Sequence, residues 1–222
     1  MISSRRKSTV SFAVLLLAAG LAPPLAAQQE SWEKLSGETQ ALYQQGKYAD
    51  ALPVAQEALR VAEASFGPEH PNVAKSLNNL AALYHAQGKY AEAEEFLKRS
   101  LAIKEKALGP DDPDVAASLN NLAALYDDQG KHSEAEPLLR RSLAIREKAL
   151  GSGHPDVARS LNNLAVLYEA QGKHADAEPL FKRLRRPWVR ITPTWLQAST
   201  TSRRSMMRRT NTPRPSHFTS AL

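Results

Sequence analysis

Apolar residues recur at helical spacing along most of the chain. Between residues 114 and 151, two apolar runs with this spacing lie on either side of Gly130. The first run consists of Leu119, Leu122, Ala123 and Tyr126, and the second of Ala135, Leu138, Leu139, Leu143 and Ile145. Side chains three and four positions apart form one face of an α-helix. Since a glycine can adopt the positive φ that ends a helix, the pattern predicts two helices joined by a short turn at Gly130.

This two-helix pattern repeats with a step of 42 residues. The tripeptide QGK begins at Gln45, Gln87, Gln129 and Gln171, and the hexapeptide SLNNLA begins at Ser76, Ser118 and Ser160. A fixed period of this length is typical of stacked helical units, each of which covers the apolar face of its neighbour. The sequence therefore predicts an all-α solenoid of four antiparallel helical hairpins, at about residues 31–66, 72–108, 114–150 and 156–184.

Prolines mark the expected helix starts. Pro71, Pro113 and Pro155 stand where the first helix of a hairpin should begin, a position at which a missing amide hydrogen costs little. The first unit differs from the others because it lacks the asparagine pair and has Tyr43 one position nearer to its glycine. We expect it to begin the stack as an atypical capping unit, with a helix from about Trp32 to Gln45.

The repeated positions resemble the tetratricopeptide repeat of the kinesin-light-chain type. The resemblance covers Trp32 to about Leu184 and rests on the 42-residue period, on the motif LNNLAALY, and on Leu80, Ala81, Tyr84, Gly88, Tyr90 and Ala93. It implies that the equivalent positions of the last three units hold each hairpin together. These positions are Ala81, Tyr84, Gly88, Ala93, Ala123, Tyr126, Gly130, Ala135, Ala165, Tyr168, Gly172 and Ala177.

The same resemblance implies that the first helices line a concave groove that binds proteins or peptides. The residues it places in the groove are Lys75, Asn78, Asn79, Ala82 and His85, then Asn120, Asn121, Ala124 and Asp127, and then Arg159, Asn162, Asn163, Val166 and Glu169. Because an asparagine amide both donates and accepts hydrogen bonds, a ladder of asparagines can hold the backbone of an extended peptide. The alternative is that one asparagine of each pair bonds a neighbouring helix or loop.

The first 27 residues have the three regions of a secretory signal peptide. Arg5, Arg6 and Lys7 precede an apolar run from Phe12 to Ala22, and small residues follow as far as Ala27. The run is shorter than the roughly 18 residues that a bilayer-spanning helix needs. We expect cleavage after Ala27, no stable membrane insertion afterwards, and a secreted or periplasmic protein.

Charge separates the two ends of the chain from its body. Three of the 29 basic residues lie in the expected signal peptide and eight follow residue 184, so residues 28–184 hold 18 basic residues against all 23 acidic ones. The body therefore has a net charge of −5. A folded module that binds nucleic acid needs a basic surface of its own. We expect no nucleic-acid partner.

Residues 185–222 depart from the repeat and are expected to form a disordered basic tail. Codons can be chosen for Arg185 to Ser202 that also encode a second sequence when the reading frame is shifted one nucleotide upstream. This second sequence is EKALGPDHPDVAASLNNL, which matches a further repeat. We interpret the tail as an out-of-frame remnant of that repeat. The alternatives are a basic arm for nucleic acid, a basic arm for membrane surfaces, and a solvated tail without a function.

The last hairpin is expected to lack a neighbour. Pro187 should stop the final helix near Arg186, because proline has no amide hydrogen and disfavours a helical residue before it. Leu180, Phe181 and Leu184 would then have no further hairpin to cover them. This uncapped end is a candidate for fraying or for self-association.

The chemistry of the side chains argues against catalysis. The chain has no cysteine, and its acidic residues recur with the repeat as surface residues do. His132 and His174 stand where tyrosine stands in other units, so we expect them to pack in their hairpins, a repeat apart and too far to share a metal. We expect a protein- or peptide-binding scaffold with no enzyme activity, metal or cofactor.

Two other interpretations remain. Bacterial arrays of the type that this chain resembles are often the amino-terminal part of longer proteins with a caspase-like peptidase domain. The chain would then be the truncated scaffold of an enzyme. The second interpretation is a product with no function.

Overall fold

The computed structural model describes residues 25–185, so residues 1–24 of the expected signal peptide and residues 186–222 of the expected tail lie outside this range. The described residues form eight α-helices and no strand. The helices are α2 (Leu25–Gln44), α3 (Tyr48–Phe66), α4 (Pro71–Ala86), α5 (Tyr90–Leu108), α6 (Pro113–Asp128), α7 (His132–Leu150), α8 (Pro155–Ala170) and α9 (His174–Leu184).

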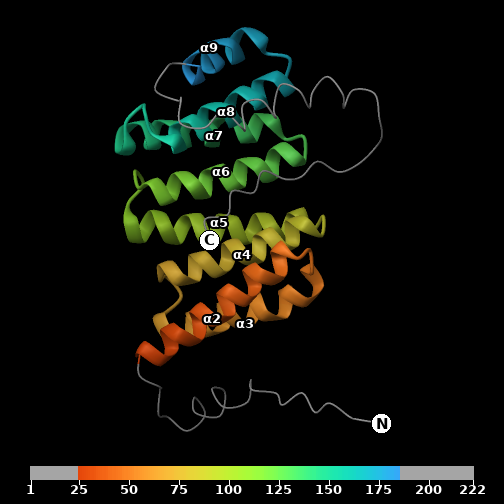
Figure 1. The fold of residues 1–222 in the computed structure, drawn as a ribbon, viewed down its shortest axis with the longest axis vertical. Helices are drawn as coiled ribbons and strands as arrows, with labels where there is room; N and C mark the ends of the chain where they lie inside the picture. Colours follow the sequence, from red (N-terminus) through yellow and green to blue (C-terminus); the bar gives the residue numbers. More distant parts are fainter. Residues whose placement is uncertain (1–24, 186–222) are drawn as a thin grey trace.

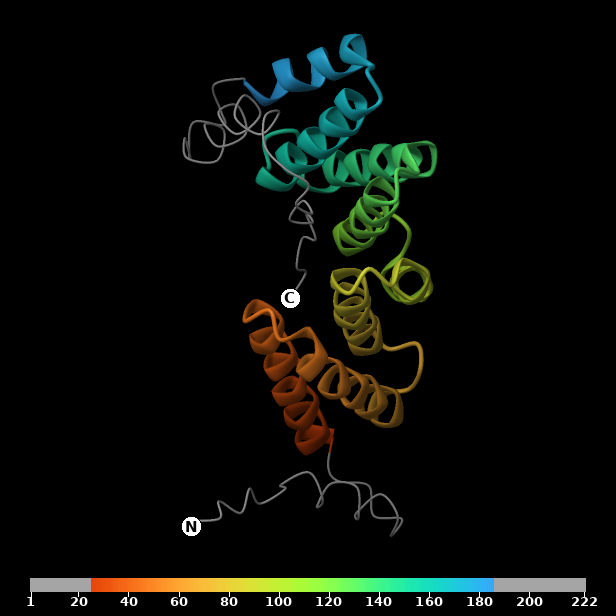
Figure 2. The ribbon, with the colours of Figure 1, turned by 90° about the vertical axis from the view of Figure 1, so that its right-hand side faces the viewer.

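Consecutive helices pair into four antiparallel hairpins that stack in chain order (Figure 1). We number the hairpins 1 to 4, so that hairpin 1 is α2 with α3 and hairpin 4 is α8 with α9. The stack is curved, with α2, α4, α6 and α8 on the inner side of the curve and the second helices on the outer side (Figure 2). The predicted all-α solenoid is confirmed. We call the inner surface, formed by these first helices, the concave face.

Local sequence explains where the first helices begin. Pro71, Pro113 and Pro155 are the first residues of α4, α6 and α8. The side chain before each proline caps the helix. His70 Nδ1 accepts a hydrogen bond from the backbone N–H of Asn72 at 3.1 Å, and Asp112 Oδ1 accepts one from the backbone N–H of Asp114 at 2.8 Å. Such caps satisfy an amide that the helix itself leaves without a partner.

Small residues and tight turns bring the helices of a hairpin together. The six alanines at the repeated positions are completely buried, namely Ala81, Ala93, Ala123, Ala135, Ala165 and Ala177. Tyr126 and Tyr168 are buried beside them, and Tyr84 is half-buried. The turn glycines Gly88, Gly130 and Gly172 have φ values of 74°, 72° and 73°. The alanines thus lie inside the stack and the glycines in its turns, and the role of these positions in holding each hairpin together stays a prediction.

Helix α2 begins seven residues before the start predicted from the sequence. The added turns contact hairpin 2, because the Asn72 side-chain amide donates to Gln29 Oε1 at 3.1 Å. At the predicted start, the Trp32 indole donates to Ser76 Oγ at 2.9 Å. Trp32 is 5% exposed. Tertiary contacts with α4 thus stabilise a segment whose own sequence has no helical repeat pattern. None of the helices between residues 25 and 185 is both long enough and apolar enough to cross a membrane.

Candidate functional site on the concave face

The asparagine pairs lie between neighbouring first helices and are largely withdrawn from solvent. Asn78 and Asn79 are each 6% exposed, Asn120 and Asn121 are fully buried, and only the pair at residues 162 and 163 is half-buried. Asn163 Nδ2 donates to Asn120 Oδ1 at 2.7 Å and so joins α8 to α6. For these two residues the structure shows the bond between helices that the sequence left open as an alternative. Peptide contact by the asparagines stays a prediction.

Two of the charged residues predicted for the groove are exposed. Lys75 extends from α4, with its ammonium nitrogen 5.8 Å from the centre of the Trp32 ring. Arg159 extends from α8, and its Nη2 lies 2.6 Å from Asp156 Oδ1. Farther along the first helices, Ala82, Ala124 and Val166 are half-buried. Lys75 and Arg159 are therefore the predicted site residues that a ligand can reach most easily.

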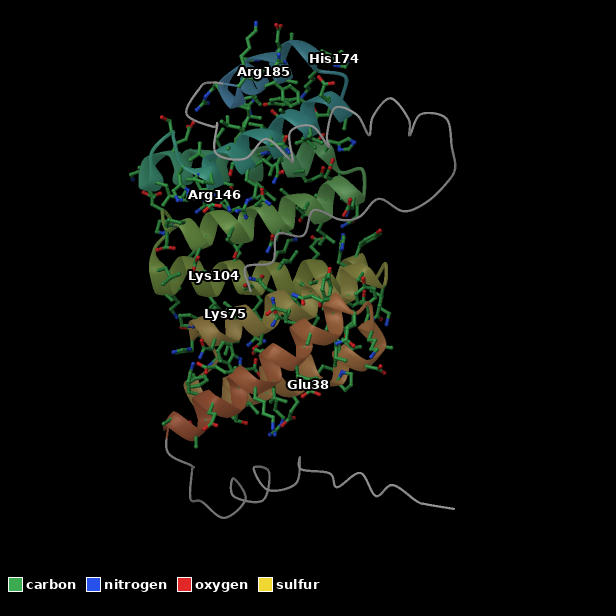
Figure 3. All side chains as sticks on the ribbon, viewed as in Figure 1. Glu38, Lys75, Lys104, Arg146, His174 and Arg185 are labelled. Atoms are coloured by element: carbon green, nitrogen blue, oxygen red, sulfur yellow. The ribbon has the colours of Figure 1, made fainter. Side chains whose placement is uncertain are left out.

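Behind each of these exposed cations lies a buried cation that the sequence analysis did not identify. Lys104 of α5 and Arg146 of α7 are 4% and 3% exposed, and they stand one repeat apart (Figure 3). The equivalent residue of hairpin 1 is Ala62, which is also buried. Because hairpin 1 has an alanine where hairpins 2 and 3 have Lys104 and Arg146, the sequence contained a sign that this position is internal.

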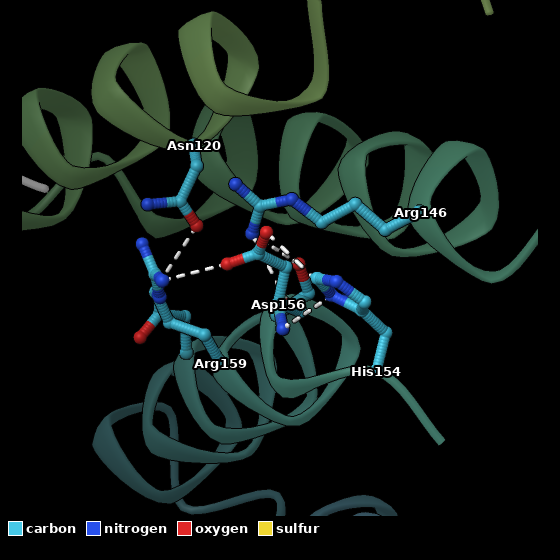
Figure 4. A network of polar contacts seen from close by, with 7 residues as sticks. Asn120, Arg146, His154, Asp156 and Arg159 are labelled. Carbon is cyan, nitrogen blue, oxygen red and sulfur yellow. Dashed lines mark hydrogen bonds and ion pairs between the residues drawn. The ribbon is translucent and has the colours of Figure 1, made fainter. Parts of the chain in front are cut away.

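Arg146 is bonded into the joint between hairpins 3 and 4. Its Nη1 donates to Ser160 Oγ at 2.8 Å and to the backbone oxygen of Asp156 at 3.3 Å (Figure 4). Lys104 differs, because it makes no hydrogen bond or ion pair with any residue between 25 and 185. The same position of the repeat thus holds a bonded cation in one hairpin and an unbonded one in another.

Burial and a neighbouring like charge both lower the pKa values of Lys104 and Arg146. Burial lowers the pKa of Lys104, the ammonium of Lys75 lowers it further, and Asp114 and Asp112 oppose the shift. Burial also lowers the pKa of Arg146, with Asp156 opposing and Arg159 adding to the shift. An additional anion near either pair of cations would favour their charged forms.

Histidine and carboxylate side chains meet at the opposite ends of the first helices. His85 Nε2 lies 2.7 Å from Asp128 Oδ2, and His132 Nδ1 lies 2.9 Å from Asp127 Oδ1. His174 contacts Glu169 at 3.1 Å, but its side chain is 73% exposed, so the prediction that it packs inside its hairpin is wrong. The equivalent residue of hairpin 2, Tyr90, is also exposed although hairpin 3 follows it, so solvent reaches this position of the repeat even inside the stack. No cluster of acidic and histidine residues in the range 25–185 could hold a metal ion.

The repeats identify the family of the chain. The tetratricopeptide repeat model matches residues 40–106, 86–148 and 129–186. The chain therefore belongs to the tetratricopeptide repeat family, whose arrays typically bind proteins or peptides. Repeats are all that this match contains, and no catalytic domain is identified by it. No curated protein matches the chain significantly.

Solved structures of similar shape include arrays of the kinesin-light-chain type. BtubC (BKLC) from P. vanneervenii is 23% identical with a TM-score of 0.62, over 83% of this chain and 68% of that one. A Podosopora anserina protein described as a kinesin light chain with nearly identical TPR-like repeats is 25% identical, with a TM-score of 0.65, over 79% of this chain and 88% of its own. The apo form of RapI is 21% identical with a TM-score of 0.61, over 71% of this chain and 42% of that one.

Proposed function

We propose that the protein is a binding scaffold that takes an extended, acidic segment of another protein along its concave face. The observation that carries this proposal is the pairing of like charges there, Lys75 with Lys104 and Arg146 with Arg159. Asp114 and Asp112 lie near the first pair, and Asp156 lies near the second. A carboxylate brought by a ligand would reduce the repulsion within a pair, which makes acidic segments the favoured class of ligand.

The accessible parts of the site suit a peptide rather than a small molecule. Lys75 and Arg159 lie on α4 and α8, with the whole of hairpin 3 between them. A ligand that contacts both must therefore extend along the stack. The Trp32 ring beneath Lys75 is buried, and it supports the lysine side chain from inside the stack. Each hydrogen bond contributes about 0.5 to 1.5 kcal/mol net, so specific binding needs several contacts along the stack.

The proposal is tested with a labelled peptide of eight glutamates and a matched peptide of eight glutamines. We expect the glutamate peptide to bind more tightly, as measured by fluorescence anisotropy. Lys75→Ala and Arg159→Ala should each weaken its binding about threefold to tenfold, which corresponds to about 0.7 to 1.4 kcal/mol. The affinity should also fall as the salt concentration rises, because exposed charges are screened.

Lys148→Ala is the matched control. This lysine is an exposed residue of the outer helix α7, and its removal changes the net charge by the same amount. Its loss should leave the affinity nearly unchanged. If the glutamine peptide binds equally well, or if Lys148→Ala weakens binding as much as Lys75→Ala, the concave face is not an acidic-peptide site.

We also propose that the protein is exported. The basic start of the chain and the apolar run that follows it support this proposal. Expression in a bacterium with separation of the periplasm, followed by amino-terminal sequencing, should give a mature chain that begins at Gln28. A cytoplasmic protein that still begins at Met1 would contradict the proposal.

A further inference from the structure

The three joints between hairpins differ in how their buried serines are bonded. Ser76, Ser118 and Ser160 are equivalent residues of α4, α6 and α8, and all three are fully buried. Ser76 receives a hydrogen bond from Trp32 of hairpin 1, and Ser160 receives one from Arg146 of hairpin 3. Ser118 receives none from Lys104, although Lys104 is the equivalent of Arg146. The joint between hairpins 2 and 3 therefore lacks the buried bond that the other two joints have.

An asparagine at the same joint shows the same difference. Asn120 of α6 and Asn163 of α8 are bonded to each other across the joint between hairpins 3 and 4. The equivalent residue to Asn120 in hairpin 2 is Asn78. Both the nitrogen and the oxygen of its amide group are buried and have no hydrogen-bond partner among residues 25–185. A buried polar group without a partner is unfavourable, because it has given up its bonds to water.

The far ends of the same two helices are bonded together. His85 near the end of α4 lies 2.7 Å from Asp128 at the end of α6. At the joint between hairpins 3 and 4, the residues at the equivalent positions are Asp127 and Ala170, and an alanine cannot make this contact. Helices α4 and α6 are thus held together at their carboxyl-terminal ends by His85 and Asp128. Farther from these ends, neither Asn78 nor Lys104 makes a hydrogen bond across the joint.

We propose that the joint between hairpins 2 and 3 is a hinge. The amino-terminal halves of α4 and α6 separate while the contact between His85 and Asp128 acts as the pivot. Opening admits water to the Lys104 ammonium and to the Asn78 amide, which removes the penalty of leaving them buried and unbonded. The motion changes the width of the concave face between these two hairpins. This inference does not depend on the proposed function.

The chain contains no cysteine, so spin labels can be placed on introduced cysteines without further changes. Pro68, Pro110 and Ser152 are exposed, equivalent residues just before α4, α6 and α8. Pulsed electron paramagnetic resonance on labels at 68 and 110 reports the joint between hairpins 2 and 3. Labels at 110 and 152 report the joint between hairpins 3 and 4. We expect a broader distance distribution for the first pair.

A reciprocal exchange of the two buried cations makes the test specific. Lys104→Arg should narrow the distribution of the 68 and 110 labels, because arginine can reach the acceptors that Arg146 uses in its own joint. Arg146→Lys should broaden that of the 110 and 152 labels. Circular dichroism checks that both variants remain helical. Equal widths in the two joints, or widths that neither exchange changes, would overturn the hinge.

Discussion

Gly130 ends the turn between α6 and α7 with a φ of 72°, a conformation that other residues adopt at a cost. A Cβ atom added at this position would meet no atom within 4 Å, so the backbone alone determines the effect of a substitution. We expect Gly130→Ala to lower the free energy of unfolding by about 1 to 2 kcal/mol. Urea denaturation followed by circular dichroism measures the change.

Gly37 provides the matched control for this prediction. It lies inside α2, it is exposed, and an added Cβ atom would also meet nothing within 4 Å. Because its backbone is helical, Gly37→Ala should raise the free energy of unfolding by about 0.5 to 1 kcal/mol. Equal effects of the same sign at both positions would show that the positive φ is not the cause.

Asn163 joins two hairpins through its bond to Asn120, and its neighbour Asn162 makes no hydrogen bond within residues 25–185. We expect Asn163→Ala to lower the free energy of unfolding by about 0.5 to 1.5 kcal/mol, the usual net contribution of a hydrogen bond. Asn162→Ala should have a much smaller effect. A double-mutant cycle of Asn120 and Asn163 that shows no coupling would contradict the assigned role.

At the scale of whole elements, a tyrosine and a glutamate connect α6 to the second helix of the preceding hairpin. The Tyr126 hydroxyl donates to Glu94 Oε1 at 2.9 Å. The hydrogen bond from Lys98 lowers the pKa of Glu94 from its ordinary value of 4.5, and the Tyr126 hydroxyl and Lys131 lower it further. A carboxyl group with a lowered pKa stabilises the fold above its unfolded-state pKa, and this contribution is lost as the pH falls through the folded-state value.

We therefore expect Glu94→Gln to lower the melting temperature at about pH 7, and we expect this effect to shrink as the pH falls through the lowered pKa of Glu94. Glu92→Gln is the control, because Glu92 is exposed and makes no hydrogen bond or ion pair with the described residues. A difference between wild type and Glu94→Gln that stays constant from neutral to acidic pH would disprove the coupling.

At the scale of the whole molecule, the stack is held by contacts between successive hairpins, so the ends differ from the middle. Helix α9 has 11 residues and packs mainly on α8, whereas the 19-residue α5 packs on both α4 and α6. We expect the amides of α9 to exchange with deuterium faster than those of α5, because local unfolding of α9 breaks fewer contacts. Mass spectrometry of a dilute monomer measures both helices, and equal protection would be the contrary result.

The amino-acid sequence by itself determined the repeating elements, because the information for them is local. The spacing of leucine and alanine defines each helical face, and a glycine with positive φ follows each first helix. A proline begins the first helix of each following hairpin. Each of these features acts within a few residues. The period then requires that the hairpins stack, since each leaves an apolar face that only its neighbour can cover.

Only the tertiary structure decided which polar residues face solvent. Asn78 and Asn79 read as groove residues, yet their burial depends on neighbouring helices far away in the sequence. Lys104 was not singled out by its sequence, but it is enclosed between packed helices. The start of α2 likewise depends on its bonds to α4. Burial is a property of the assembled stack, because solvent is excluded from a side chain by its neighbours in space and not by its neighbours in the chain.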